Sequence, residues 1–259
     1  MTDALNMGAI TRDFGDRGAL ECLLAGADLL LVLGDTERQT RALNELERAF
    51  REGLIPMERI RDARRRVDKL RGKFPSQPDG FSTSPADELL MDTAAERAVT
   101  RLGEIEPLRR DEAIVIVARE DRQANPALAV TDLESIATAV HRHLRSEVAG
   151  CELVLYPPKQ PMDCKSQLES ATRSADRVLW LTASRLRPSS AERELAIHTA
   201  GVARSWVHVA VYSPYAALDI PGPAVLTYGY RDPALRALVR ALKDPSTCSG
   251  KLPIELGPV

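Results

Sequence analysis

Short apolar runs alternate with segments of helical periodicity over the second half of the chain. The runs are rich in Val, Leu and Ile, as strands buried in a parallel sheet are, and they lie at 113–117, 152–156, 177–182, 207–212 and 224–228. Helical patterns lie at 133–148, 162–175, 191–206 and 232–242. Strands and helices that alternate at this length pair in parallel through right-handed crossovers. The pattern predicts a mostly parallel α/β sandwich.

The first part of the chain has a different order of elements. A helical pattern at 17–25 leads into the unbroken apolar run 29–33, which predicts a strand buried on both faces. Two further helices are expected, one at 36–52 with a glycine stop and a strongly basic one at 56–70. The predicted order is therefore helix, strand, helix, helix.

A segment without periodicity separates these two parts. It is rich in Pro, Ser and Gly, which is typical of a linker. We therefore expect a first domain at 1–75, a linker at 76–88 and an α/β sandwich domain at 89–259. No internal repeat of fixed period is evident.

Composition restricts the classes of partner. The chain has 259 residues, 44% of them hydrophobic, and a formal net charge of -2, so neither nucleic acid nor a membrane surface is an expected partner. The four cysteines form no C-x-x-C pair, and neither a zinc site nor a disulfide scaffold is predicted. The apolar stretch 23–33 contains Gly26 and Asp28 and is too short to span a bilayer. We expect a cytoplasmic protein.

Four segments follow one another in an order that resembles glycoside hydrolase family 3. TDALNMGAI at 2–10 resembles the nucleophile segment that ends the family's seventh barrel strand, and AGADLLL at 25–31 is similar to the entry into the eighth. GLIP at 53–56, with the basic helix after it, resembles the end of the barrel domain. The stretches at 213–215, 226–229 and 250–254 resemble the end of the family's second domain. The form ALNMGA is most similar to bacterial β-N-acetylhexosaminidases.

This resemblance implies a fold and an activity. Residues 1–75 would be the remnant of a (β/α)8 barrel, and Asp3 would be the nucleophile in retaining hydrolysis of terminal N-acetylglucosaminides from cell-wall muropeptides or chitin oligomers. In this subgroup a His-Asp pair upstream of the nucleophile donates the proton, next to a K-H-F-P-G-H-G motif, and neither occurs in this sequence. We therefore expect an incomplete glycosidase that is weakly active or inactive alone. Its expected partner is a saccharide substrate or ligand, and no cofactor is expected.

Alternatives remain open for the first domain. An aspartate near a chain start also caps short helices without any catalytic role. The second functional class is a non-catalytic carbohydrate-binding or protein-interaction module derived from the same family. Because a barrel remnant with one strand leaves apolar faces uncovered, we expect residues 1–75 to dock on the second domain, to self-associate or to meet a partner chain.

Loops of the second domain are further candidates by resemblance. In some branches of the family they lend an acid/base or a substrate contact, which points to Asp121, Arg122 and Gln123 or to the loop 185–187. Ordinary loop polarity explains the same residues.

Histidines and the basic helix are weaker candidates. His141 and His143 are two residues apart on a predicted helix and cannot chelate a metal together, so we expect solvated positions. His198 is expected to be structural or on the surface, and His208 to be a core residue with one hydrogen bond. The basic segment 59–73 predicts a solvated face rather than an RNA-binding one, because it contains no aromatic residue.

Overall fold

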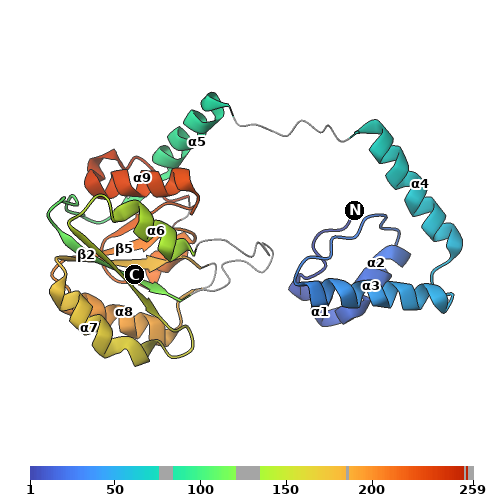
Figure 1. Ribbon diagram of the computed structural model, residues 1–259, viewed down its shortest axis with the longest axis horizontal. Coiled ribbons are helices and arrows are strands. Elements are labelled where there is room, and N and C mark those ends of the chain that lie inside the picture. Colours follow the sequence, from blue (N-terminus) through green and yellow to red (C-terminus); the bar gives the residue numbers. More distant parts are fainter. Residues whose placement is uncertain (76–83, 121–134, 185–186, 254, 256–259) are drawn as a thin grey trace. The chain divides into compact units, whose positions relative to one another are not determined.

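The computed structural model describes residues 1–75, 84–120, 135–184, 187–253 and 255. The chain divides into two compact units, one containing residues 1–75 and the other beginning at Thr83 (Figure 1). Each unit has its own buried hydrophobic clusters. Among the described residues, none of the helices combines the length and the apolar character that a membrane span requires.

Helices make up most of the first unit. They are α1 (Gly8–Phe14), α2 (Gly18–Leu24), α3 (Thr36–Arg51) and α4 (Met57–Lys73). The helices predicted at 17–25, 36–52 and 56–70 are confirmed. The limits of α3 follow from local chemistry, because the side chain of Asp35 accepts a hydrogen bond from the backbone of its first turn and Gly53 adopts a φ of 75° beyond its end.

Small and aliphatic side chains form the core of this unit. Leu20, Ala49 and Ile55 are buried in one cluster. Ala19 and Ala42 are buried in another. Alanines at the contact allow α2 and α3 to approach closely, so this small unit buries few large side chains.

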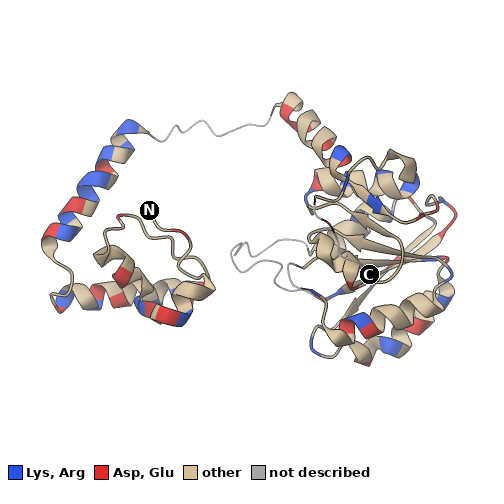
Figure 2. Cartoon of the chain, turned by 180° about the vertical axis from the view of Figure 1, so that it is seen from behind, with Lys and Arg blue, Asp and Glu red and all other residues tan. Residues whose placement is uncertain are grey.

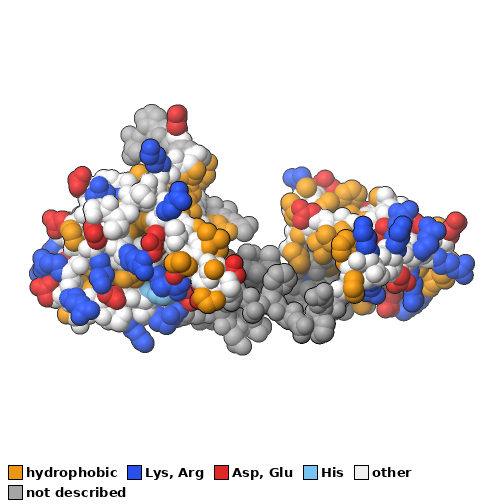
Figure 3. Space-filling model, turned by 90° about the horizontal axis from the view of Figure 1, so that it is seen from above, with side chains coloured by type: hydrophobic (Ala, Val, Ile, Leu, Met, Phe, Trp, Pro, Cys, Tyr) orange, Lys and Arg blue, Asp and Glu red, His pale blue; other side chains and the backbone are white. Residues whose placement is uncertain are grey.

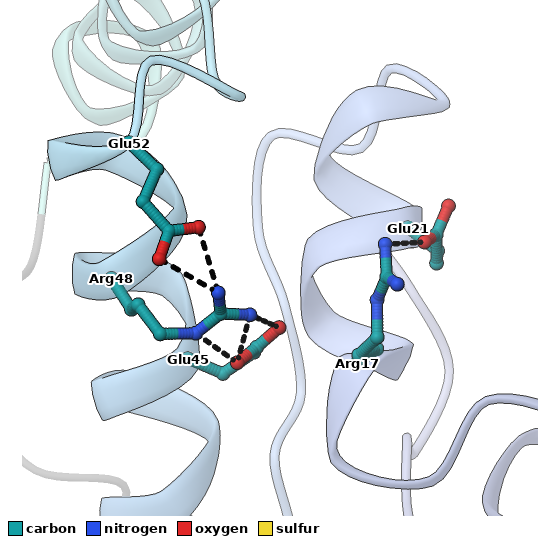
Figure 4. A network of polar contacts seen from close by, with 5 residues as sticks. All are labelled: Arg17, Glu21, Glu45, Arg48 and Glu52. Atoms are coloured by element: carbon teal, nitrogen blue, oxygen red, sulfur yellow. Dashed lines mark hydrogen bonds and ion pairs between the residues drawn. The ribbon is translucent and has the colours of Figure 1, made fainter.

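Ion pairs between residues three or four positions apart lie along α2 and α3 and at their ends (Figure 4). Arg48 lies between Glu45 and Glu52, with N–O distances of 2.8 and 2.7 Å, and Arg17 lies 3.0 Å from Glu21. Exposed pairs of this kind stabilise a helix only weakly. The network therefore supports two helices and does not form a site.

The segment predicted as a buried strand at 29–33 is not a regular strand, and this prediction is wrong. The segment forms one isolated parallel bridge, between Ala4 and Leu31. Leu29 and Leu31 are 37% and 38% exposed. A strand buried on both faces needs a neighbour on each side, and in the described part of the chain this segment pairs only with residues 2–5. The apolar run therefore indicates an extended conformation but not a regular strand.

The second unit is built on a six-stranded sheet with the order β1-β6-β5-β4-β2-β3. The strands are β1 (Thr100–Leu102), β2 (Ala113–Arg119), β3 (Gly150–Tyr156), β4 (Arg177–Thr182), β5 (Trp206–Ala210) and β6 (Ala224–Leu226). All neighbouring strands are parallel except β1, which pairs antiparallel to β6. The predicted mostly parallel α/β sandwich is confirmed.

Helices cover both faces of this sheet (Figure 1). On one face lie α6 (Ile136–Leu144) and α9 (Asp232–Lys243), and on the other α7 (Lys165–Ser174) and α8 (Ser190–Val202). Successive strand residues point to opposite faces, so each strand contributes to both layers. Trp180 of β4 is fully buried in the layer with α7 and α8.

An additional helix, α5 (Pro85–Ala98), begins inside the segment 76–88 that was expected to be a linker. Ser84 and Asp87 form a reciprocal capping box, and Pro85 occupies the first helical turn. The Pro- and Ser-rich composition at 84–87 therefore starts a helix that packs against α9. Residues 76–83 lie outside the described residues, and the domain limits 1–75 and 89–259 stay a prediction.

The short strand β1 was not predicted because three residues show no clear alternation. A segment near the carboxyl terminus contacts the residue just before β1, since the amide of Gly250 donates to the carbonyl of Val99 at 2.9 Å. A Cβ at Gly250 would overlap the backbone of Ala98. Glycine is therefore required at this crossing, which accounts for one residue of the segment 250–254.

Candidate functional site

Asp3 lies on an extended segment of the first unit. Backbone hydrogen bonds of 2.9 Å join residues 2–5 to the carbonyls of residues 29 and 31, on both sides of Asp3. Its side chain is exposed, and Oδ1 accepts a hydrogen bond from the amide of Ala4 at 2.7 Å. The backbone around Asp3 is thus held by the bridge between Ala4 and Leu31, while the residue itself is exposed.

An exposed carboxylate has the chemistry of a nucleophile but needs a positioned partner. Retaining glycosidases use a second group about 5 Å away to protonate the leaving oxygen. Among the described residues Asp3 forms no ion pair, and no three His, Cys, Asp or Glu side chains gather as a metal site. The nearby cavity lined by Leu5, Val32 and Arg38 has a volume of about 10 Å³, room for one water molecule. Residues 1–75 alone therefore form no pocket for a sugar ring at this cavity.

Asp28, in the second segment of the family resemblance, has a structural partner. Arg59 of α4 lies 2.9 Å from the carboxylate of Asp28 and also donates to the carbonyls of Leu23 and Ala27, at 2.8 and 2.7 Å. The Arg59 hydrogen bond holds the pKa of Asp28 below its ordinary value of 3.8. The motif residues Asp28 and Arg59 thus join α4 to the turn after α2.

The solvated positions expected for His141 and His143 are wrong. Nε2 of His141 lies 3.0 Å from the carbonyl of Cys151 on β3, and Nε2 of His143 lies 3.2 Å from Asp232 at the start of α9. The His143 hydrogen bond lowers the pKa of Asp232. His141 thus contacts β3 and His143 contacts the start of α9, so each histidine links α6 to a different neighbouring element.

The other two histidines behave as predicted. Nε2 of His198 lies 2.6 Å from Glu169 and links α8 to α7 at the surface. His208 is fully buried in β5, and its Nε2 lies 2.8 Å from Oγ1 of Thr182. Burial lowers the pKa of His208 to about 3, so the ring is neutral. Neither ring belongs to a candidate active site.

The loop candidates of the second domain are mostly outside the described residues. This applies to Asp121, Arg122 and Gln123, and to residues 185 and 186. Arg187 is described and forms a bidentate pair with Asp219, at 2.8 and 2.7 Å. The guanidinium of Arg187 holds the pKa of Asp219 below its usual range. Its role as a substrate contact stays a prediction.

Most of the basic segment 59–73 forms a solvated face of α4, as predicted, and the exception is Arg59, whose side chain is 14% exposed. Figure 2 shows acidic residues interleaved with the basic ones along this helix. Arg64 is 83% exposed and pairs with Asp68, and Arg66 pairs with Asp62 at 2.8 Å. Intrahelical pairing of this kind offsets part of the positive charge of the segment.

A cavity that the sequence did not predict lies at the carboxyl edge of the sheet in the second unit. It is lined by the ends of β2, β3 and β4 and by the first turns of α6 and α8, and includes Arg119, Tyr156 and Glu192. Tyr156 ends a predicted strand, Arg119 follows another by two residues, and Glu192 lies at the start of a predicted helix. The carboxyl ends of parallel strands converge at one edge, so this position was the available signal.

Solved structures of similar fold include family 3 glycoside hydrolases. A family 3 β-N-acetylglucosaminidase from Paenibacillus sp. str. FPU-7 aligns with 97% of this chain at 24% identity and a TM-score of 0.69, and the chain covers 50% of it. A fungal multi-domain family 3 β-N-acetylglucosaminidase aligns with 98% at 24% identity and a TM-score of 0.69, with 30% of its length covered. A β-glucosidase from Listeria innocua aligns with 89% at 17% identity and a TM-score of 0.52, with 35% covered.

The chain therefore has the fold of part of these proteins, over both of its units, and spans half of their length or less. The fold that the sequence resemblance implies is confirmed. No family model matches the sequence, and no curated protein matches it significantly.

Proposed function

We propose that the chain belongs to glycoside hydrolase family 3 and is of the β-N-acetylhexosaminidase type, acting with retention on terminal N-acetylglucosaminides of cell-wall muropeptides or chitin oligomers. The observation that supports this most is the fold likeness to a family 3 β-N-acetylglucosaminidase over 97% of the chain, in both units. The segment TDALNMGAI at 2–10, which resembles the family's nucleophile segment, also supports this proposal.

In this proposal Asp3 attacks the anomeric carbon. A bond forms between its carboxylate oxygen and C1 while the glycosidic C–O bond breaks, and the leaving oxygen takes a proton from an acid. Water then hydrolyses the glycosyl-enzyme ester and regenerates the carboxylate. The exposed side chain of Asp3 supports the role of attacker. In this proposal the acid is a group that is not among the described neighbours of Asp3. We therefore expect the chain alone to turn the substrate over slowly.

We also propose that residues 1–75 are covered in the working protein, by the second unit, by a second copy or by a partner chain. Leu29, Leu31 and Leu43 support this, with exposures of 37%, 38% and 56%. Figure 3 shows further hydrophobic side chains at the surface of both units. The four cysteines are free thiols, which supports a cytoplasmic location.

The test of this function is turnover of p-nitrophenyl N-acetylglucosaminide by the chain and by a version extended upstream. Asp3→Asn should abolish any turnover, and mass spectrometry should find a sugar ester on Asp3 when a slow fluorinated substrate is used. Asp13→Asn, an exposed carboxylate on the following helix, is the matched control and should keep wild-type turnover. Absence of turnover and of labelling in both chains would remove the enzyme proposal.

A non-catalytic carbohydrate-binding or protein-interaction module is the second candidate. The cavity in the second unit favours it, because this cavity does not involve Asp3. Under this alternative, saccharide or protein binding survives Asp3→Ala. Binding measured for the wild type and for this variant separates the two functions.

A further inference from the structure

The strand order of the second unit creates a divergence between β2 and β4. The chain leaves β2 towards α6 on one face of the sheet and leaves β4 towards α8 on the opposite face (Figure 1). In open parallel sheets, ligands bind in the crevice outside the carboxyl ends of two strands whose connections diverge in this way. The topology thus singles out one point on the sheet edge before any side chain is considered.

A cavity lies at this point. It is lined by Ala118 and Arg119 at the end of β2, by Thr182 at the end of β4 and by Glu192 in the first turn of α8. Its volume of about 40 Å³ holds about three water molecules. This is room for a hydroxymethyl group or a pair of hydroxyls, and it excludes a whole nucleotide.

The polar wall of the cavity retains capacity for hydrogen bonds. Glu192 is 5% exposed, and its Oε2 accepts from the amide of Ser189 at 2.8 Å. Among the described residues, its Oε1 has more distant partners, at 3.3 Å to the hydroxyl of Tyr156 and 3.5 Å to the guanidinium of Arg119. A carboxylate oxygen accepts two hydrogen bonds, and the best bonds to it are shorter than 3 Å. Oε1 can therefore take a further donor.

Charge selects the kind of ligand. An anion would meet the Glu192 carboxylate, and a cation would meet the Arg119 guanidinium, in a partly enclosed site where like charges repel strongly. A neutral group that both donates and accepts satisfies both residues. Ile136, Leu181 and Pro188 supply an apolar wall beside them, the usual mixture at small-molecule sites.

We propose that this cavity binds a hydroxyl group of a neutral, polyhydroxylated small molecule of the saccharide class, with Glu192 accepting from the ligand, Arg119 donating to it, and Tyr156 holding the Glu192 carboxylate through its own hydroxyl. The site lies within the second unit and does not require the proposed role of Asp3. Tyr156 is held for this task by its ring, which stacks on Trp180 at 5.3 Å between centroids.

The test is calorimetric or NMR titration of the full chain with N-acetylglucosamine, and with sodium acetate as an anionic probe. We expect millimolar binding of the sugar. Glu192→Gln should weaken it about tenfold or more, because a charge-assisted hydrogen bond is lost while the amide oxygen can still cap α8. Tyr156→Phe keeps the stacked ring and should weaken binding about threefold. Glu194→Gln, exposed on the same helix, is the matched control and should bind as the wild type does.

Three results would overturn the proposal: no sugar binding by the wild type, unchanged binding by Glu192→Gln, or tighter binding of acetate than of the sugar. Asp3→Asn separates this site from the proposed active site. If binding persists in Asp3→Asn and falls in Glu192→Gln, the site in the second unit is supported whether or not the chain hydrolyses glycosides.

Discussion

The guanidinium of Arg59 lies 2.9 Å from the carboxylate of Asp28 and joins the last helix of the first unit to the turn after α2. Both side chains are mostly buried, with exposures of 14% and 20%. Arg59 also donates to the carbonyl of Leu23, near the end of α2, and to the carbonyl of Ala27, in the turn that follows. One side chain thus satisfies three acceptors at the end of α2 and in the turn after it.

Arg59→Ala should therefore loosen the first unit selectively. Loss of its charged hydrogen bonds costs about 1.5–3 kcal/mol, and amide exchange in α2 and the following turn should accelerate accordingly. Hydrogen exchange measured by mass spectrometry gives the effect by segment. Arg64→Ala, whose side chain is 83% exposed on the same helix, should leave exchange unchanged. Equal effects of both substitutions would contradict the anchoring role of Arg59.

The same contact predicts an acid dependence. The folded pKa of Asp28 is lowered from 3.8, so the contribution of the ionised form is present above that value and is lost as the pH falls through the lower folded pKa. Asp28→Asn should destabilise the first unit near neutral pH, and its difference from the wild type should narrow on acidification below about pH 4. Exchange rates in α2 at several pH values measure this. A difference that widens towards low pH would reverse the sign and refute the argument.

Periodicity predicted most of the second unit because the hydrophobic pattern of each element matches the way that element is buried in the fold. β4 has the bounds 177–182 of its apolar run, since it lies in the middle of the sheet and is covered on both faces. The helix predicted at 232–242 is α9, one residue longer, because its apolar stripe faces one sheet. Local pattern and tertiary position agree at both places.

Elements that depend on distant partners were predicted less well. The run 29–33 is as apolar as β4, yet it has only residues 2–5 beside it and forms a single bridge. His143 was expected in solvent, and its partner is Asp232, 89 residues further along the chain. The sequence did not indicate Glu192 as a cavity residue, because only the fold brings it close to Tyr156. Composition and spacing carry no information on such pairings.

The buried pair Arg177–Glu112 lies at the amino-terminal end of β4 and should contribute strongly to the stability of the second unit. Their side chains are 2% and 5% exposed and 3.1 Å apart. Glu112→Ala leaves a buried guanidinium uncompensated and should cost about 3–5 kcal/mol. Urea unfolding followed by tryptophan fluorescence measures it, because both tryptophans, Trp180 and Trp206, lie in this unit. Asp111→Ala, with a 76% exposed side chain next to Glu112, is the control and should change stability by less than about 0.5 kcal/mol.

The exposed apolar residues of the first unit predict association. In multi-angle light scattering, the chain should exceed its monomer mass of 28.4 kDa as its concentration rises, because Leu29 and Leu31 are partly exposed on a segment that pairs, among the described residues, with residues 2–5 alone. Leu31→Glu should shift the mass towards the monomer. Ile197→Glu, at a 59% exposed position of α8, should not. A monomer at all concentrations, with no effect of Leu31→Glu, would contradict self-association and leave docking on the second unit or on a partner chain as the ways to cover this segment.

His208 predicts how the second unit responds to mild acid. The folded pKa is about 3, below the ordinary value of 6.5, so the unfolded chain takes up a proton that the folded protein does not. Stability contributed by the neutral ring is therefore complete above about pH 6.5 and falls by about 1.4 kcal/mol per pH unit below it, down to about pH 3. His208→Gln should be less stable at neutral pH but should lose less stability between pH 7 and about pH 5. Urea midpoints by tryptophan fluorescence give both values, and His198→Gln, at a partly exposed position, should follow the wild-type slope. If His208→Gln and the wild type change in parallel with pH, the buried ring is not the group that responds.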